Sequence, residues 1–149
     1  MSPYRHLLLA VDLSQHSRQV ALRAQQLATS FGARLDIIHV VEFVPVEPMG
    51  ETLMPAVQIE EELLERAQQR LDQLVTDLNL QVEELHVEAG NVKAEILRVA
   101  QERKVDLIVL GSRERHGLSI MINLTEDTVL HQSPCDVLAV RVGNSKAQS

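Results

Sequence analysis

The sequence is poor in aromatic residues and in cysteine. Its 149 residues include no Trp, one Tyr, two Phe and one Cys. A single cysteine cannot form an internal disulfide bond, which fits a reducing compartment such as the cytoplasm. Because aromatic residues are scarce, Leu, Val, Ile and Ala must fill the core, as in proteins that pack helices against a sheet.

Long hydrophobic runs and excess positive charge are also absent. No apolar run reaches the roughly 18 residues that a membrane span requires, and the first residues lack the pattern of a signal peptide. The formal net charge is -7, whereas proteins that bind nucleic acid normally present a basic face. We therefore expect a cytoplasmic protein with no membrane span and no nucleic-acid partner.

The motifs of several familiar enzyme and cofactor sites are missing. No glycine-rich loop ends in Lys-Ser or Lys-Thr, and Asp12-Leu13-Ser14-Gln15 stands where a dinucleotide fingerprint would follow the first apolar run. Gly117-Leu118-Ser119 begins like a nucleophile elbow, but Met121 replaces its closing glycine. The six histidines show no metal-ligand spacing. We expect no catalytic residues and no metal site.

Short apolar runs recur along the chain and predict strands that are buried on both faces of a parallel sheet. In chain order they are Leu7–Val11, Arg34–Val41, Asp106–Leu110 and Asp136–Val142. A weaker alternation of apolar and polar residues at 81–89 suits an edge strand.

In the segments between these strands, apolar residues recur at the spacing of a helix. The predicted helices run from about Ser14 to Phe31, from Ile59 to Leu78, onward from Asn91 through Ile96 and Ala100, and from about Asn123 to His131. Ser14 and Asn91 are predicted N-caps, and Gly32 is placed to end the first helix in a left-handed conformation. The alternation predicts one α/β domain over 1–142 with a mainly parallel, five-stranded sheet, then a disordered tail at 143–149. Phe43–Val57, rich in proline, is predicted to be a long loop that suits binding.

Four blocks of this sequence resemble the universal stress protein family. They are His6–Ser14, His39-Val40, Asp106–Arg113 and Ser133–Val140, in the order and spacing of that family across essentially the whole chain. The resemblance implies a doubly wound sheet in strand order 3-2-1-4-5 with helices on both faces. It also implies a homodimer, commonly paired through the last strand, here Asp136–Val142. Some members of the family bind ATP and others do not.

The ATP-binding members carry a motif of three glycines, which this chain matches only in part. When the motif is aligned with this sequence, its three glycine positions fall on Gly111, Glu114 and Leu124. The hydroxyl position that follows falls on Thr125. Glycine lets the backbone approach a phosphate closely, and Leu124 adds bulk there. Glu114 adds a negative charge, and like charges 4 Å apart repel by roughly 4 kcal/mol at an effective dielectric of about 20. We therefore expect ATP to bind weakly or not at all.

Ligands of parallel sheets bind beyond the carboxyl ends of the strands, where neighbouring connections diverge. In the implied strand order this places a crevice between the segments that follow the first and fourth strands. The candidate nucleotide or anion site comprises Asp12, Val40, Gly111, Ser112, Arg113 and Thr125. Arg113 and Arg115 favour an anion and Asp12 suits a hydroxyl or amine, while Glu114 opposes a triphosphate. A nucleoside, a monophosphate or a bare anion therefore fits better than ATP.

These residues also have purely structural interpretations. Asp12 is equally suited to cap the first helix, Gly111 to turn the chain after its strand, and Arg113 to lie in a solvated loop. His39 is interpreted as a packed or a surface histidine, and Cys135 as a small packing residue.

Three functions remain open from the sequence. The favoured one is a non-catalytic stress-response protein that acts as a dimeric interaction module, with another protein as its partner. The alternative is a nucleotide-binding regulator in which AMP or ATP occupies a degraded site. A hydrolase or nucleotide-transfer enzyme is disfavoured because no nucleophile is paired with a base.

Overall fold

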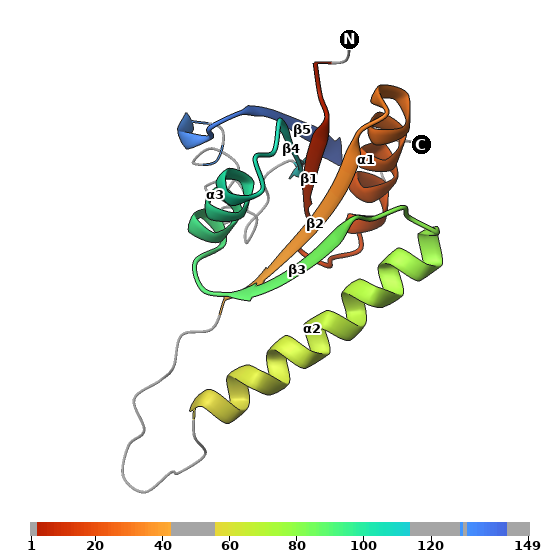
Figure 1. The fold of residues 1–149 in the computed structure, drawn as a ribbon. Helices are drawn as coiled ribbons and strands as arrows, with labels where there is room; N and C mark the ends of the chain where they lie inside the picture. Colours follow the sequence, from red (N-terminus) through yellow and green to blue (C-terminus); the bar gives the residue numbers. More distant parts are fainter. Residues whose placement is uncertain (1–2, 43–55, 114–128, 130, 143–149) are drawn as a thin grey trace, which may run out of the picture.

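Five parallel strands form the centre of the molecule, in the order β3-β2-β1-β4-β5 (Figure 1). They are β1 (His6–Ala10), β2 (Arg34–Val41), β3 (Glu84–Ala89), β4 (Leu107–Arg113) and β5 (Asp136–Val142). This computed structural model describes residues 3–42, 56–113, 129 and 131–142. The strand order implied by the resemblance is confirmed, and so is the edge position of the strand predicted at 81–89. The predicted tail at 143–149 lies outside the described residues.

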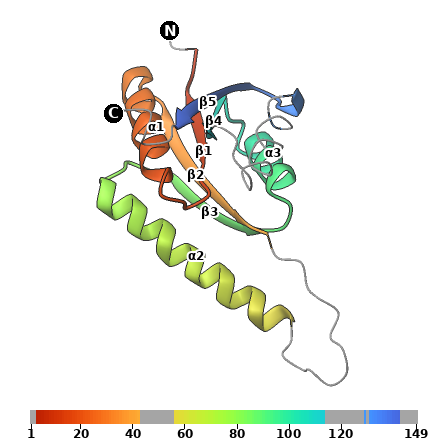
Figure 2. The same ribbon diagram turned by 180° about the vertical axis from the view of Figure 1, so that it is seen from behind.

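Helices cover both faces of this sheet (Figures 1 and 2). They are α1 (Ser17–Phe31), α2 (Ala56–Leu78) and α3 (Val92–Glu102). Residues of α1 and α2 pack with one face of the strands, and residues of α3 pack with the other. Most of the predicted loop Phe43–Val57 and of the predicted helix Asn123–His131 lies outside the described residues. Within these two segments, α2 begins at Ala56, and Val129 and His131 are helical.

The apolar run of β1 shows why these strands contain few polar residues. Leu7 and Leu9 belong to the core under α1 and α2, whereas Leu8 belongs to the core under α3. All three side chains are fully buried. Successive side chains of a strand point to opposite faces, so a strand covered on both sides must be apolar throughout.

Two of the three predicted helix caps are confirmed. The side chain of Asn91 accepts a hydrogen bond from the Ala94 N–H, and Gly32 ends α1 in the left-handed region at φ 65°. The predicted N-cap Ser14 is wrong, because α1 starts later, with His16 at the N-cap and no side-chain cap bond. The chain first makes a turn in which the Ser14 carbonyl accepts a hydrogen bond from the Ser17 N–H.

The interpretation of Gly111 as the turn after the fourth strand is also wrong. β4 continues through Gly111, Ser112 and Arg113, which pair with Val140, Arg141 and Val142 of β5. Leu110 is therefore not the end of the strand. The extension places Gly111 opposite Val140 and Arg113 opposite Val142, the last residue of β5.

Candidate functional site

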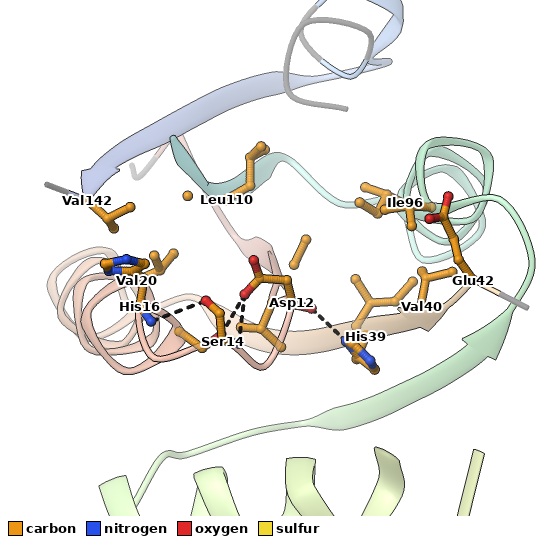
Figure 3. Close-up of a pocket in the computed structure, with 16 residues that line it drawn as sticks. Asp12, Ser14, His16, Val20, His39, Val40, Glu42, Ile96, Leu110 and Val142 are labelled. Carbon is orange, nitrogen blue, oxygen red and sulfur yellow. Dashed lines mark hydrogen bonds between the residues drawn. The ribbon is translucent and has the colours of Figure 1, made fainter. Parts of the chain in front are cut away.

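A pocket of about 290 Å³ opens at the carboxyl ends of β1, β2 and β4 (Figure 3). Its walls are mainly apolar and include Val20 of α1, Val40 of β2, Ile96 of α3 and Leu110 of β4. The polar side chains that line it are Asp12, Ser14, His16, Ser17, His39 and Glu42. An apolar cavity with a few convergent polar groups is typical of a small-molecule site.

The structure brings three of the six predicted site residues together. Asp12, Val40 and Gly111 all line the pocket. Ser112 follows Gly111 in β4 but is not among the lining residues. Thr125 and the side chain of Arg113 lie outside the described part of the chain. Ligand binding at this position stays a prediction.

Asp12 holds the turn between β1 and α1. Its Oδ1 accepts hydrogen bonds from the Ser14 N–H at 2.9 Å and from the Ser17 hydroxyl at 3.1 Å. The side chain is nevertheless exposed and lies centrally among the labelled pocket residues (Figure 3). The structural and the ligand-contacting interpretations of Asp12 are therefore compatible, because one carboxylate can serve both.

His39 fixes the neighbouring backbone. Its Nδ1 lies 2.9 Å from the carbonyl oxygen of Val11. Burial lowers the pKa of His39, and the charge of Arg70 lowers it further, although the bond to Val11 and the charge of Asp12 act in the opposite direction. The neutral ring therefore donates from Nδ1–H to the Val11 carbonyl. His39 is half-buried, which fits the packed rather than the surface interpretation, but it also lines the pocket, which was not predicted from the sequence.

Gly111 lies at a position of close packing. A Cβ at this position would lie 3.1 Å from Cγ2 of Val20, closer than most real Cβ contacts. Val20 is buried, with 4% of its surface exposed, and lines the same pocket. Gly111 therefore lets β4 approach α1 at the pocket wall.

A buried polar cluster lies elsewhere in the sheet, and the sequence analysis missed it. Asp36 of β2 is 0% exposed. Its carboxylate lies 2.8 Å from Nε2 of His6, 2.9 Å from Nε2 of His86, and 2.7 Å from Nε of Arg103. In the sequence, the sign of this cluster is Asp36 itself, an acidic residue within the otherwise apolar segment 35–38.

The charge of Asp36 is compensated inside this cluster. Burial alone raises the pKa of Asp36, but the hydrogen bonds from Arg103, His86 and His6 outweigh burial and hold the pKa below its ordinary value. The carboxylate accepts, so His6 and His86 each donate from Nε2. Nδ1 of His6 is buried and has no hydrogen-bond partner within the described structure. None of the four residues lines the pocket, so the cluster supports the sheet rather than the candidate site.

Metal and thiol chemistry find no support in the described residues. Within the described ranges, no group of three or more His, Cys, Asp or Glu residues could hold a metal ion. Cys135 is half-buried and its Sγ lies 3.6 Å from the Ser133 hydroxyl; burial raises the pKa of its thiol. Cys135 therefore packs as a small residue. Among residues 3–42, 56–113 and 129–142 (130 excepted), no helix is long and apolar enough to cross a membrane.

Comparison with known proteins gives one consistent family. The model of the universal stress protein family matches residues 3–141. "Universal stress protein A homolog 1" of Coxiella burnetii is 37% identical over 138 residues, which are 92% of this chain and 96% of that protein. "Universal stress protein A homolog 2" of the same organism is 35% identical over 146 residues, covering 97% of this chain and 100% of that protein.

Solved structures show the same fold. The universal stress protein UspA from Lactobacillus plantarum superposes with a TM-score of 0.71 at 24% identity, covering 93% of this chain and 98% of that one. A universal stress protein in complex with cAMP superposes with a TM-score of 0.57 at 20% identity, again covering 93% and 98%.

Proposed function

Because this chain belongs to the universal stress protein family, we propose that it is a non-catalytic, cytoplasmic stress-response protein that acts as a dimeric regulatory module. We further propose that it binds ATP weakly or not at all. The observation that carries this proposal is the glycine motif of the sequence, in which Glu114 and Leu124 stand in place of two of the three glycines. Glu114 follows directly on Arg113, the last residue of the strand whose Leu110 and Gly111 line the pocket.

The charges around the pocket support this proposal. Its described lining contains two carboxylates, Asp12 and Glu42, and no Lys or Arg. His39 is neutral because burial lowers its pKa. A triphosphate therefore gains no cationic partner from the described lining and is repelled by its carboxylates. The apolar walls suit an uncharged ligand such as a nucleoside, or a monophosphate, which carries fewer negative charges than ATP.

The serines of the pocket support a role without catalysis. The Ser14 Oγ accepts a hydrogen bond from the His16 backbone N–H, and the Ser17 hydroxyl donates to Asp12. Within the described structure, neither serine is hydrogen-bonded to an imidazole. The ring of His39 is instead bonded to the Val11 carbonyl. The carboxylate of Asp12 holds the Ser17 hydroxyl within the turn before α1, so neither described serine is paired with the imidazole that most often activates a serine nucleophile.

The proposed dimer pairs β5 with its own copy. β5 lies at one edge of the sheet, with half-buried Val137 and Leu138 in it. An uncovered edge strand invites pairing with another chain. A two-fold dimer joins the same edge of both copies and leaves neither edge open.

The alternative function is a nucleotide-binding regulator with a weakened phosphate site. Its support is the complex of one structural relative with cAMP, a nucleotide with a single negative charge. The carboxylates of Asp12 and Glu42 in the described lining repel such a ligand less than they repel ATP. The two functions differ in whether a nucleotide must be bound in the pocket for the protein to act.

Native mass spectrometry of the purified protein, followed by calorimetry on variants, tests the proposal. We expect no ATP to co-purify. The double variant Glu114→Gly/Leu124→Gly should bind ATP about tenfold more tightly or better, equivalent to about 1.4 kcal/mol. Glu114→Gln separates the charge from the backbone effect and should give only part of that gain. Co-purified ATP in the wild-type protein would overturn the proposal.

A further inference from the structure

We infer that Arg70 of α2 is a positioning residue for the pocket, holding the turn that carries Asp12 without lining the pocket itself. Nη2 of Arg70 donates to the backbone carbonyl of Leu13 at 2.6 Å. Leu13 directly follows Asp12, whereas Arg70 lies 57 positions further along the chain. The ligand part of this inference rests on the function proposed above.

The backbone of this turn is strained at Leu13. Its φ is 59°, in the left-handed region that side chains other than glycine rarely adopt. The Leu13 side chain is buried, with 9% of its surface exposed, in the core under α1 and α2. A strained residue persists where the surrounding structure fixes it. Burial fixes the Leu13 side chain, and the guanidinium group fixes its carbonyl.

Two side chains hold the backbone carbonyls of the residues that flank Asp12. His39 of β2 bonds to the carbonyl of Val11 at 2.9 Å, and Arg70 bonds to that of Leu13. Between them, the Asp12 carboxylate accepts from the Ser14 N–H. The bond from Arg70 is charge-assisted and therefore among the stronger ones in the turn. Asp12 is thus held at the pocket by groups from three elements: His39 of β2, Arg70 of α2, and Ser17 of α1, whose hydroxyl donates to the Asp12 carboxylate.

His39 and Arg70 also act on each other. The charge of Arg70 lowers the pKa of His39, in addition to the effect of burial. This keeps His39 neutral, the form in which one ring nitrogen donates and the other does not. Removing Arg70 should therefore release the Leu13 carbonyl and also raise the pKa of His39. A residue that only stabilised α2 would do neither.

The test compares Arg70→Gln and Arg70→Lys with a matched control, Arg66→Gln. Arg66 is exposed on the same helix, one turn earlier. Without any ligand, NMR measures amide exchange at Ser14, the carbonyl shift of Leu13 and the titration of His39. We expect Arg70→Gln to speed Ser14 exchange about tenfold, move the Leu13 carbonyl signal and raise the His39 pKa. Arg70→Lys should retain most of the wild-type behaviour, and Arg66→Gln all of it.

Calorimetry with AMP then measures how each substitution changes ligand affinity. We expect Arg70→Gln to weaken AMP binding by about threefold or more, and Arg66→Gln to leave it unchanged. If the wild-type protein binds no AMP, the proposed ligand class is wrong, while the ligand-free NMR data still decide the role of Arg70. If Arg70→Gln matches Arg66→Gln in all three NMR readouts, the inference is overturned.

Discussion

Nε2 of His6 lies 2.8 Å from Oδ1 of Asp36, and the two side chains are 2% and 0% exposed. This contact joins β1 to β2 through a charged group inside the core. Such a carboxylate is tolerated only when its charge is compensated, and Arg103 and His86 complete the compensation. The pair therefore makes the stability of the sheet depend on one buried acid.

Asp36→Asn should destabilise the protein by about 3 kcal/mol, because removing one partner leaves the others with unmet hydrogen-bonding needs. The matched control is Glu84→Gln. Glu84 also lies near Arg103, at 3.4 Å, but its side chain is 52% exposed. An exposed pair of this kind contributes about 1 kcal/mol or less. Urea unfolding measures both variants, and equal effects would contradict a special role for the buried acid.

The same cluster predicts how stability responds to acid. The pKa of Asp36 in the folded protein lies below the ordinary value of 3.8, so its contribution is complete above that value and is lost as the pH falls through the folded pKa. The difference in unfolding free energy between wild type and Asp36→Asn should therefore shrink as the pH is lowered from about 4 to about 2. Urea unfolding across this range tests it, and a difference that grows with acid would contradict the assignment.

Much of the fold could be predicted from local patterns. The unbroken apolar run at Leu7–Leu9 indicated a strand buried on both faces, and Asn91 and Gly32 marked helix ends correctly. These signals are local, because each depends on a few consecutive residues. The strand order came from the resemblance to a family, since periodicity alone does not determine which strands are neighbours.

What could not be predicted depends on contacts between distant residues. His6, His86 and Arg103 lie 30, 50 and 67 positions from Asp36 along the chain. No short sequence motif indicates that these residues are in contact. The predicted end of β4 at Leu110 is wrong for a similar reason, because the strand continues to Arg113. Glycine commonly marks a turn, but here pairing with Val140 of β5 extends the strand. The same glycine also makes room for Val20, which the sequence alone does not show.

Gly111 and Val20 should be energetically coupled. Gly111→Ala places a Cβ 3.1 Å from Cγ2 of Val20, so Val20 must shift. In a Val20→Ala background the added Cβ meets more open space and should be better tolerated. A double-mutant cycle on unfolding free energy should give a coupling of about 0.5 kcal/mol or more. Additive effects of the two substitutions would show that the close approach has no energetic consequence.

The proposed dimer can be tested at Ala139, an exposed residue of β5. Val140 and Val142 of the same strand are buried in the core under α1 and α2. A lysine at either position would disturb the fold itself. Ala139→Lys instead places like charges near each other across a two-fold interface and should yield monomer, while Ala94→Lys, at an exposed site on α3, should not. Light scattering distinguishes these outcomes, and a monomeric wild-type protein would contradict the dimer.

Competition between ATP and AMP for the wild-type pocket tests the central claim most directly. The account predicts that isothermal titration calorimetry gives ATP a weaker affinity than AMP, or no measurable heat, because the described lining of the pocket has two carboxylates and no Lys or Arg, and because Glu114 directly follows β4 in the sequence. A prior addition of AMP should abolish any residual ATP signal. A low-micromolar dissociation constant for ATP, with ATP displacing AMP, would contradict the account.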